Sequence, residues 1–347
     1  MSSFYHGKTI LVTGSTGFKG SWLSLWLHHL WARVIGYSLP PSTDPSAFQL
    51  LHLEDSITQV YWDINTLENL QSVCDEYQPE IVFHLAAQPL VRESYRDPVW
   101  TFQTNVMGTV NVLEVIRKTE SIRWAVLITT DKVYENLETM RPYLETDRLG
   151  GYDPYSTSKA MDELAITSYV RSFFSHGEKK IVSVRAGNVI GGGDWSDERL
   201  IPDIVRAFEK WDPVTLRNPD SVRPWQHVLE PISGYLIMGE KIFESDTYLG
   251  AYNFGPDISD TMRVEDIVKK AIEILGKWEY CIQKEEIMHE AWLLLLDNTK
   301  SKNILWWSPR LSIDDALSCT FEWYRAYADG ADMREYSLRE IERFSKI

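Results

Sequence analysis

Short apolar runs alternate with longer amphipathic stretches along the first half of the chain. The short runs predict strands, and the longer stretches repeat apolar residues at helical spacing, as Trp22, Trp26 and Leu30 do on one face. The predicted strands cover residues 8–13, 33–37, 80–85, 123–129 and 181–185, and the predicted helices cover residues 18–31, 99–118 and 155–175.

Strands that alternate with helices predict right-handed crossovers and a parallel sheet with helices on both faces. The expected fold class is therefore α/β, with a doubly wound parallel sheet of the Rossmann type. After Gly187 the alternation gives way to longer loops rich in Gly, Pro and Trp. We therefore expect residues 1–187 to form one domain and residues 188–347 to form a smaller, partly interwoven substrate lobe, some segments of which return to the first domain.

Composition and charge exclude several classes of protein. The 347 residues carry a formal net charge of -15 without a basic cluster, which argues against nucleic acid and anionic membrane surfaces as partners. No apolar run approaches the roughly 18 residues of a membrane span, and the first residues lack a signal-peptide pattern. The three cysteines, Cys74, Cys281 and Cys319, lack metal-ligand spacing. We therefore expect a cytoplasmic protein without a metal site.

A glycine-rich segment, Thr13-Gly14-Ser15-Thr16-Gly17-Phe18-Lys19-Gly20, joins the first predicted strand to the first predicted helix. Glycines three residues apart allow a tight turn and let the backbone approach a pyrophosphate at the helix N-terminus. A single motif of this kind is also common in plain turns, but the strand before it and the helix after it favour dinucleotide binding. We assign Gly14, Thr16, Gly17 and Phe18 to a cofactor site.

The end of the second predicted strand bears on the choice of dinucleotide. Residues 36–39 contain no Asp or Glu for an adenosine ribose and no Arg for a 2'-phosphate, so residue chemistry leaves NAD and NADP both open. Asp63 and Ile64, after the next apolar segment, are candidate adenine contacts. An aspartate in a loop is also typical of a turn cap.

Tyr155 and Lys159 lie four residues apart, so they share one face of the predicted helix. A nearby cation favours a phenolate, and Lys159 is expected to lower the pKa of Tyr155 from its reference of about 10 toward neutrality, so that Tyr155 can act as a base. Thr130 follows a strand at the carboxyl edge of the sheet, where its hydroxyl can orient a substrate hydroxyl. The Tyr/Lys spacing alone is common on helix surfaces, but its register with Thr130 and the glycine motif favours catalysis.

Asp131 and Lys132 distinguish two kinds of chemistry. A dehydrogenase or epimerase needs only hydride transfer, whereas a dehydratase must also remove a proton beside a carbonyl and protonate a departing hydroxyl. Two ionisable groups next to Thr130 supply that capacity. A lysine serves as a base only if burial or a neighbouring cation, here Lys159, depresses its pKa. The alternative is a turn aspartate followed by a solvated lysine.

Together these motifs resemble the extended short-chain dehydrogenases/reductases and, within them, the CDP-glucose 4,6-dehydratases. The glycine and Tyr/Lys motifs mark only the superfamily, whereas Lys132 in place of a glutamate is more specific. The stretches that carry the resemblance cover residues 16–23, 84–92, 104–109, 131–132, 150–155, 185–195 and 217–228.

The resemblance implies a redox-neutral reaction. Tyr155 would take the proton of the sugar 4-hydroxyl while hydride moves from C4 to tightly held NAD. Lys132 would then assist removal of the C5 proton, and Asp131 would protonate the departing 6-hydroxyl. Hydride would return to C6 and give CDP-4-keto-6-deoxyglucose and water.

The resemblance also implies further site residues and a homodimer or homotetramer built on helices 99–118 and 155–175. The cofactor site would include Leu85, Ala86, Ala87, Asn105, Tyr155 and Lys159. The nucleotide-sugar site would include Gln88, Asn188, Arg199, Leu200, Arg217, Arg223 and His289.

Three positions depart from the family pattern: Ser15 where a histidine is usual, Val133 in place of a cysteine, and Leu293–Leu296 in place of interspersed polar residues. We expect the first to alter cofactor affinity, the second to change packing, and the third to alter sugar or nucleotide preference.

Two other functions fit the same motifs, namely an NDP-sugar 4-epimerase or reductase and a non-catalytic NAD-binding regulatory protein.

Overall fold

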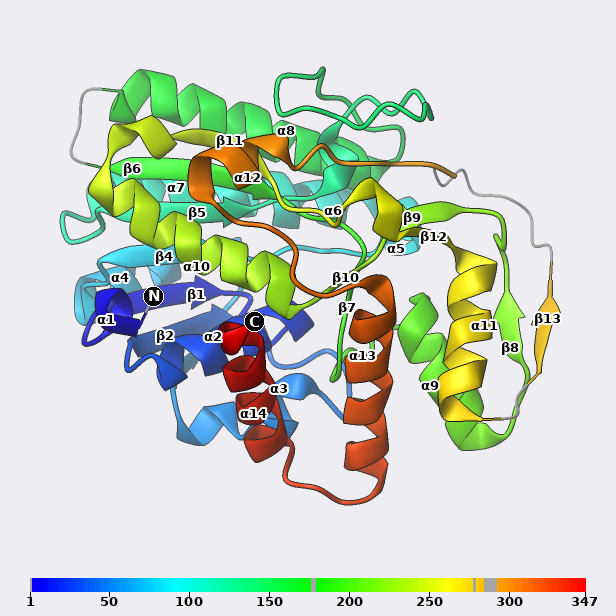
Figure 1. The fold of residues 1–347 in the computed structure, drawn as a ribbon. Helices are drawn as coiled ribbons and strands as arrows, with labels where there is room; N and C mark the ends of the chain where they lie inside the picture. The colour runs from blue at the N-terminus through cyan, green and yellow to red at the C-terminus, as the bar shows by residue number, and fades with distance from the viewer. Residues whose placement is uncertain (1, 176–178, 277–278, 284–291) are drawn as a thin grey trace.

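A seven-stranded parallel sheet in the order β11-β6-β5-β4-β1-β2-β3 forms the centre of the protein (Figure 1). The computed structural model describes residues 2–175, 179–276, 279–283 and 292–347. The strands of the sheet are β1 (Thr9–Thr13), β2 (Arg33–Ser38), β3 (Thr58–Tyr61), β4 (Ile81–His84), β5 (Trp124–Ile128), β6 (Lys180–Arg185) and β11 (Gly250–Asn253).

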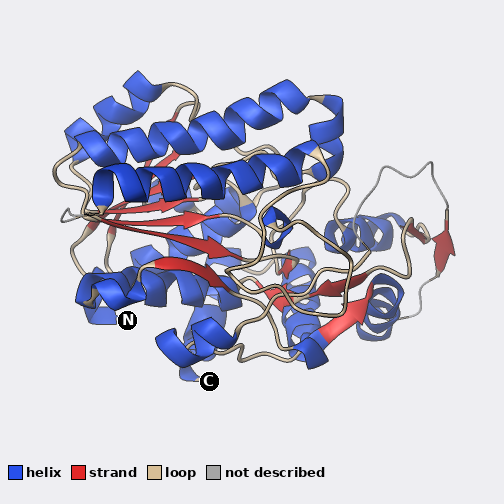
Figure 2. Cartoon of the chain, turned by 90° about the horizontal axis from the view of Figure 1, so that it is seen from above, coloured by secondary structure: helices blue, strands red, loops and turns tan. Residues whose placement is uncertain are grey.

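Helices cover both faces of this sheet (Figure 2). One face packs against α2 (Phe18–His29) and α10 (Leu229–Glu244), and α14 (Met333–Lys346) contacts α2 from outside. The other face packs against α4 (Leu67–Tyr77), α7 (Gly108–Lys118) and α8 (Pro154–Tyr169). Each face has its own cluster of buried apolar side chains, so the sheet is buried on both sides. The predicted α/β doubly wound class is confirmed.

The sequence pattern predicted neither β3 nor α4. β3 is an edge strand whose residues are half-buried or exposed, so its apolar periodicity is weak. The predicted helix 99–118 is continuous through three pieces: α6 (Pro98–Phe102), the π-helical turn η2 (Gln103–Met107) and α7. A second π-helical turn, η4 (Val170–Phe174), extends α8.

The chain after residue 187 forms a smaller lobe beside the carboxyl ends of the sheet strands, and also returns to the sheet through α10 and β11. Three two-stranded pairs and two helices make up the lobe: β7 (Val189–Ile190) with β10 (Gln226–His227), β8 (Val214–Leu216) with β13 (Tyr280–Ile282), β9 (Val222–Pro224) with β12 (Thr261–Arg263), α9 (Leu200–Lys210) and α11 (Val264–Leu275). The remaining α-helices of the described residues are α1 (Ser2–Tyr5), α3 (Ala47–Leu50), α5 (Val91–Arg96), α12 (Thr299–Leu305) and α13 (Ile313–Ala328). The domain boundary at residue 187 stays a prediction.

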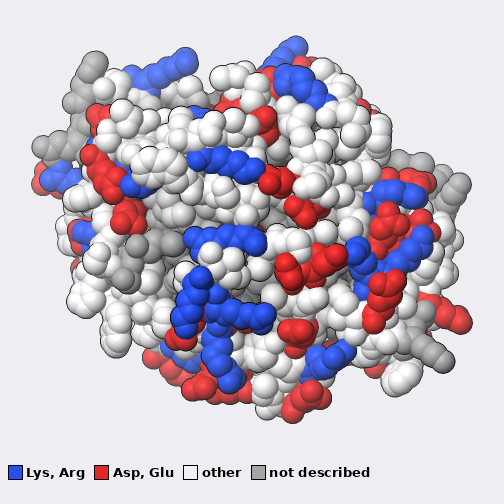
Figure 3. Space-filling view, in the orientation of Figure 1, with Lys and Arg blue, Asp and Glu red and all other residues white. Residues whose placement is uncertain are grey.

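Acidic and basic side chains are interspersed on the face shown in Figure 3, with a group of basic side chains over the region of α14. Within the described ranges, none of the helices has the length and apolar character needed to cross a membrane.

Candidate active site

A cavity of about 710 Å³ opens at the carboxyl ends of the sheet strands, between the sheet and the smaller lobe. That volume is typical of a small-molecule or cofactor site, and its position is the one that open α/β sheets use for ligands. The predicted site residues that line it are Gly14, Thr16, Gly17, Phe18, Asp63, Ile64, Leu85, Ala86, Ala87, Gln88, Thr130, Asp131, Lys132, Tyr155, Lys159, Asn188, Arg199, Leu200, Arg217 and Arg223.

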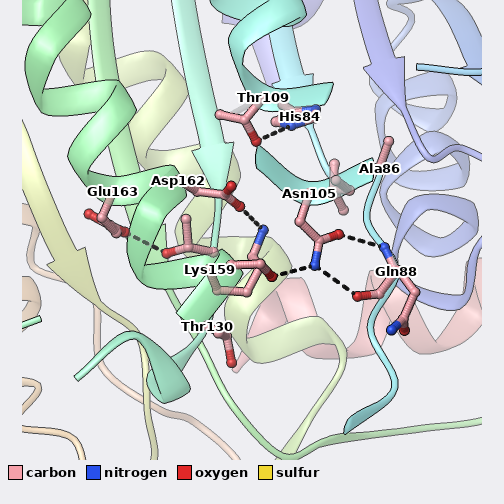
Figure 4. A network of polar contacts seen from close by, with 12 residues as sticks. His84, Ala86, Gln88, Asn105, Thr109, Thr130, Lys159, Asp162 and Glu163 are labelled. Atoms are coloured by element: carbon pink, nitrogen blue, oxygen red, sulfur yellow. Dashed lines mark hydrogen bonds and ion pairs between the residues drawn. The ribbon is translucent and has the colours of Figure 1, made fainter. Parts of the chain in front are cut away.

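Two predicted site residues are not among those that line the cavity. Asn105 is buried behind the wall, where its Oδ1 accepts from the Gln88 backbone N–H at 2.7 Å and its Nδ2 donates to Ser158 Oγ at 2.8 Å (Figure 4). Asn105 therefore holds the loop after β4 in place. His289 lies outside the described residues.

The glycine loop has the backbone geometry that a pyrophosphate site requires. Gly14 adopts φ 72°, and a Cβ there would lie 2.7 Å from the Ala86 backbone nitrogen, so a larger residue does not fit. Gly17 precedes α2 without a side-chain cap, which leaves the first N–H groups of the helix available to an anion. These features fit the diphosphate of a dinucleotide.

The structure shows where Asp63 and Ser15, two residues with predicted effects on the cofactor, lie relative to the cavity. Asp63 lines the cavity, and its Oδ1 also accepts from the Asn65 backbone N–H at 2.9 Å, so it is a turn residue as well. Ser15 is fully buried and donates to Gln59 Oε1 at 2.8 Å. Because Ser15 packs against β2 and β3 rather than lining the cavity, its effect on the cofactor can only be indirect.

Thr130 and Asp131 lie directly after β5, at the edge of the sheet. The Thr130 hydroxyl donates to Asp131 Oδ1 at 2.8 Å, and Asn188 Nδ2 lies 3.5 Å from Oδ2. Gly187 makes room for this carboxylate, because a Cβ there would lie 2.0 Å from Oδ2. Asp131 is buried and begins the 3-10 helical turn Asp131–Val133, so it is also the turn aspartate of the alternative interpretation. Lys132 is half-buried and lines the same end of the cavity.

Helix α8 presents Tyr155 and Lys159 to the cavity. Asp153 caps the helix by accepting from the Ser156 backbone N–H at 2.9 Å, and Pro154 occupies its first turn, so the sequence sets where the helix begins. Tyr155 and Lys159 then lie one turn apart, and both line the cavity.

The prediction that the Lys159 charge brings the pKa of Tyr155 down toward neutrality is wrong. Burial raises the pKa of Tyr155 above its usual value and outweighs the lowering effects of a hydrogen bond with Thr130 and of the Arg199 cation. Lys159 instead donates to Asp162 Oδ2 at 2.5 Å. The sequence pattern placed the two side chains on one helix face but did not reveal that an acidic side chain compensates the lysine.

Lys19 is a site residue that the sequence interpretation missed. It projects from the first turn of α2 into the cavity, where burial and the cations of Arg199 and Lys159 lower its pKa to about 8. Among the described residues, its ammonium has no hydrogen-bond or ion-pair partner. A lysine inside the glycine-rich motif was the available signal.

Arginines of the smaller lobe line the opposite wall. Arg199 Nη1 donates to Asp194 Oδ2 at 3.0 Å, and Arg217 Nη2 donates to Asp203 Oδ2 at 3.4 Å. Arg223 is buried and donates to the Val222 carbonyl at 3.1 Å. These guanidinium groups give the wall positively charged positions that suit the anionic part of a ligand, in a protein of net charge -15. Among the described residues, no group of three or more His, Cys, Asp or Glu side chains is arranged so that it could hold a metal ion.

The side-chain amide of Gln88 bonds to neighbouring protein groups. Its Nε2 donates to the Leu90 carbonyl at 3.0 Å and to Thr101 Oγ1 at 2.9 Å. Gln88 lines the cavity, and its predicted contact with the substrate stays a prediction.

The residues Leu293–Leu296 do not line the cavity. All four are buried, and Leu294 and Leu296 pack with Val133, Tyr134 and Tyr143. The structure gives this departure a packing role, so it offers no basis for the altered sugar preference that we expected from these residues.

Comparisons with known proteins identify the family. A family model described as GDP-mannose 4,6 dehydratase matches residues 11–320. The chain is 46% identical to the CDP-glucose 4,6-dehydratase of Salmonella typhimurium over 98% of this chain and 96% of that protein. It is 27% identical to the dTDP-glucose 4,6-dehydratase of Haemophilus influenzae over 91% and 97% of the two chains.

Solved structures show the same fold. A UDP-glucose 4-epimerase from Thermotoga maritima superposes with a TM-score of 0.81 at 24% identity, covering 92% of this chain and 99% of its own. A dTDP-glucose 4,6-dehydratase from Bacillus anthracis in complex with NAD superposes with a TM-score of 0.79 at 23% identity, covering 94% and 100%. The chain therefore belongs to the extended short-chain dehydrogenases/reductases described by the GDP-mannose 4,6 dehydratase model and, within them, to the CDP-glucose 4,6-dehydratase family.

Proposed function

We propose that this protein is an NAD-dependent hydro-lyase that converts CDP-glucose to CDP-4-keto-6-deoxyglucose and water. The observation that carries the proposal is the meeting of Asp131 and Lys132 with Thr130 and Tyr155 at one end of a cavity whose wall includes the glycine loop. An epimerase or reductase needs no acid and base beside the Thr/Tyr/Lys set. The 46% identity to a CDP-glucose 4,6-dehydratase supports the choice of nucleotide and sugar.

The chain's own groups account for the proton transfers. Tyr155 removes the proton of the 4-hydroxyl, and Thr130 orients that hydroxyl. The resulting 4-ketone acidifies the C5 proton, which Lys132 removes, while Asp131 protonates the 6-hydroxyl so that it leaves as water. Lys132 then returns the proton to C5 as hydride adds at C6. NAD held by the glycine loop and Lys159 would supply the hydride acceptor for C4 and the hydride donor for C6. Lys159 lies where it can hold the cofactor beside Tyr155.

The direct test is to incubate the purified protein with CDP-glucose and NAD and to follow the product by mass spectrometry beside other NDP-hexoses. We expect CDP-glucose to lose one water without net formation of NADH. Water loss from a different NDP-hexose would keep the mechanism and change the substrate. Inversion at C4 without water loss would replace the proposal with an epimerase, and no reaction with any substrate would favour a binding protein.

Lys19 bears on cofactor binding. Its unpartnered ammonium lies on the helix turn that faces the expected diphosphate, and at pH 7, below its pKa of about 8, it is mostly protonated. A hydrogen bond from a charged donor is worth about 1.5–3 kcal/mol, so Lys19→Met should weaken NAD binding about 10- to 100-fold. Quenching of tryptophan fluorescence during NAD titration would measure the change.

Lys8 provides a matched control for Lys19. It lies at the opposite end of β1 and pairs with Glu80 at 3.3 Å, away from the cavity. Lys8→Met should leave NAD affinity unchanged. If Lys19→Met weakened the binding of CDP but not of NAD, its partner would be the diphosphate of the substrate instead.

We also propose that the protein works in the cytoplasm as a homodimer or homotetramer. Apolar side chains are exposed along the outer faces of α6 and α8 and on η4, with Val99 75% exposed, Leu164 58% and Phe173 53%. α6 and α8 pack side by side, and a contiguous apolar patch on such a face is typical of a protein–protein interface. Light scattering after size-exclusion chromatography would measure the number of subunits.

A further inference from the structure

Asp162 is a buried carboxylate directly behind the catalytic lysine. It lies on α8, three residues after Lys159, and its side chain is 1% exposed. Oδ2 accepts from the Lys159 ammonium at 2.5 Å, and Figure 4 shows the lysine turned toward it. Lys159 lines the cavity whereas Asp162 does not, so this carboxylate can act on a ligand only through the lysine.

A chain of hydrogen bonds leads from the glycine-rich segment toward Asp162. Thr13 Oγ1 accepts from the backbone N–H groups of Leu85 and Ala86, both at 3.2 Å, so its own proton is directed at His84 Nδ1, 2.7 Å away. Burial lowers the pKa of His84 to about 3, so the ring is neutral and its one proton lies on Nε2.

The second half of this chain ends at Thr109, near the carboxylate. His84 Nε2 donates to Thr109 Oγ1 at 3.1 Å. The donor and acceptor in each bond of this chain are assigned from its start, because the backbone N–H groups of Leu85 and Ala86 can only donate. Burial raises the pKa of Asp162 to about 6, although Lys159 and, less strongly, Thr109 act to lower it. Asp162 Oδ1 has no hydrogen-bond partner among the described residues, so the contact with Lys159 is the one that holds this carboxylate.

Both acidic and basic groups surround the Lys159/Asp162 pair. Glu163 on α8 pairs with Arg185 of β6 at 2.7 Å, so that carboxylate is already compensated. Across the cavity, the Lys19 cation repels Lys159 and the Asp131 carboxylate lies beside them. His84 of β4 is neutral. Asp162 is therefore the carboxylate in direct contact with Lys159, in a site where other cations disfavour a second protonated lysine.

We propose that Asp162 is a positioning residue: from behind the cavity wall its carboxylate holds the Lys159 ammonium in one orientation, and its buried charge sets the pH range in which Tyr155 works as a base. The inference rests on the proposed function, because it concerns the same reaction.

Removing this carboxylate should move the acidic limb of the pH profile. Loss of a buried negative charge makes proton loss from the Tyr155 phenol easier. In Asp162→Asn, the acidic limb of the profile of kcat/KM against pH is therefore expected to shift to lower pH, by about 1 unit or more. Asp162→Ser, which is smaller but equally uncharged, should give the same shift and keeps the test available if the asparagine variant does not fold.

Glu163→Gln is the matched control. It removes a neighbouring buried carboxylate of the same helix, but one that pairs with Arg185 instead of Lys159. It should lower stability while shifting the pH profile much less. An unshifted profile in folded Asp162 variants, or an equal shift in Glu163→Gln, would overturn the inference. Absence of dehydration by the wild-type protein would instead overturn the proposed function, so the two failures are distinguishable.

Discussion

Replacement of Tyr155 by phenylalanine is expected to lower kcat for dehydration about 10³-fold, within the usual range for loss of a positioned general base. The variant keeps the ring that fills this buried position and loses only the hydroxyl that bonds to Thr130 and would accept the substrate proton. NAD affinity and the unfolding temperature should change little. Single-turnover assays with CDP-glucose, together with NAD titrations, would separate the lost proton transfer from lost binding.

Tyr134→Phe is the matched control for this variant. Tyr134 is equally buried, but its hydroxyl donates to Asn253 at 2.7 Å and accepts from Arg185 at 2.8 Å, outside the cavity. Its loss should cost about 1–3 kcal/mol of stability because two buried groups lose a partner, while kcat stays near that of the wild type. Near-normal dehydration by Tyr155→Phe would remove Tyr155 from the mechanism.

The second large effect is expected from Asp131→Asn combined with Lys132→Met. These changes remove the acid and the base of the elimination but leave Thr130, Tyr155 and Lys159 in place. The 4-keto-6-deoxy product should fall by about 10²- to 10⁴-fold. Oxidation at C4 should persist, so absorbance of NADH at 340 nm should accumulate to the concentration of active sites and stop there.

The comparison that separates a dehydratase from an epimerase uses the same double variant. Asp147→Asn is a suitable control, because Asp147 pairs with Arg141 in the connection between β5 and α8 and does not line the cavity. If the double variant kept full turnover with CDP-glucose, Asp131 and Lys132 would not carry the elimination. If it inverted C4 as fast as the wild type, the protein would be an epimerase.

Much of the site was predictable because it depends on local order along the chain. Apolar periodicity located β1, β2, β4, β5 and β6, and the carboxyl ends of parallel strands meet at one edge of a sheet. Thr130 and the glycine loop therefore had to converge there. The cap at Asp153 and the spacing of four residues between Tyr155 and Lys159 placed both side chains on one helix face.

The edge strand β3 was not predictable from apolar periodicity. Its residues Thr58–Tyr61 are only partly buried, so they carry little of the apolar signal by which a strand is recognised. Its pairing with β2 depends on the sheet already being in place. β11 pairs with β6 although the two strands lie far apart in the chain, and no local pattern encodes such a neighbour.

By itself, the sequence determined the fold class and the glycine loop, since these follow from periodicity and spacing, and it predicted the Thr130, Asp131, Lys132, Tyr155 and Lys159 set, whose catalytic role stays a prediction. Only the tertiary structure decided the electrostatics of that set. Burial raises the pKa of Tyr155, Asp162 accepts the Lys159 ammonium, and Arg199, from the smaller lobe, lies close enough to lower the pKa of Lys19. The physical reason is that desolvation and charge interactions depend on distances through space, which residue spacing along the chain does not contain.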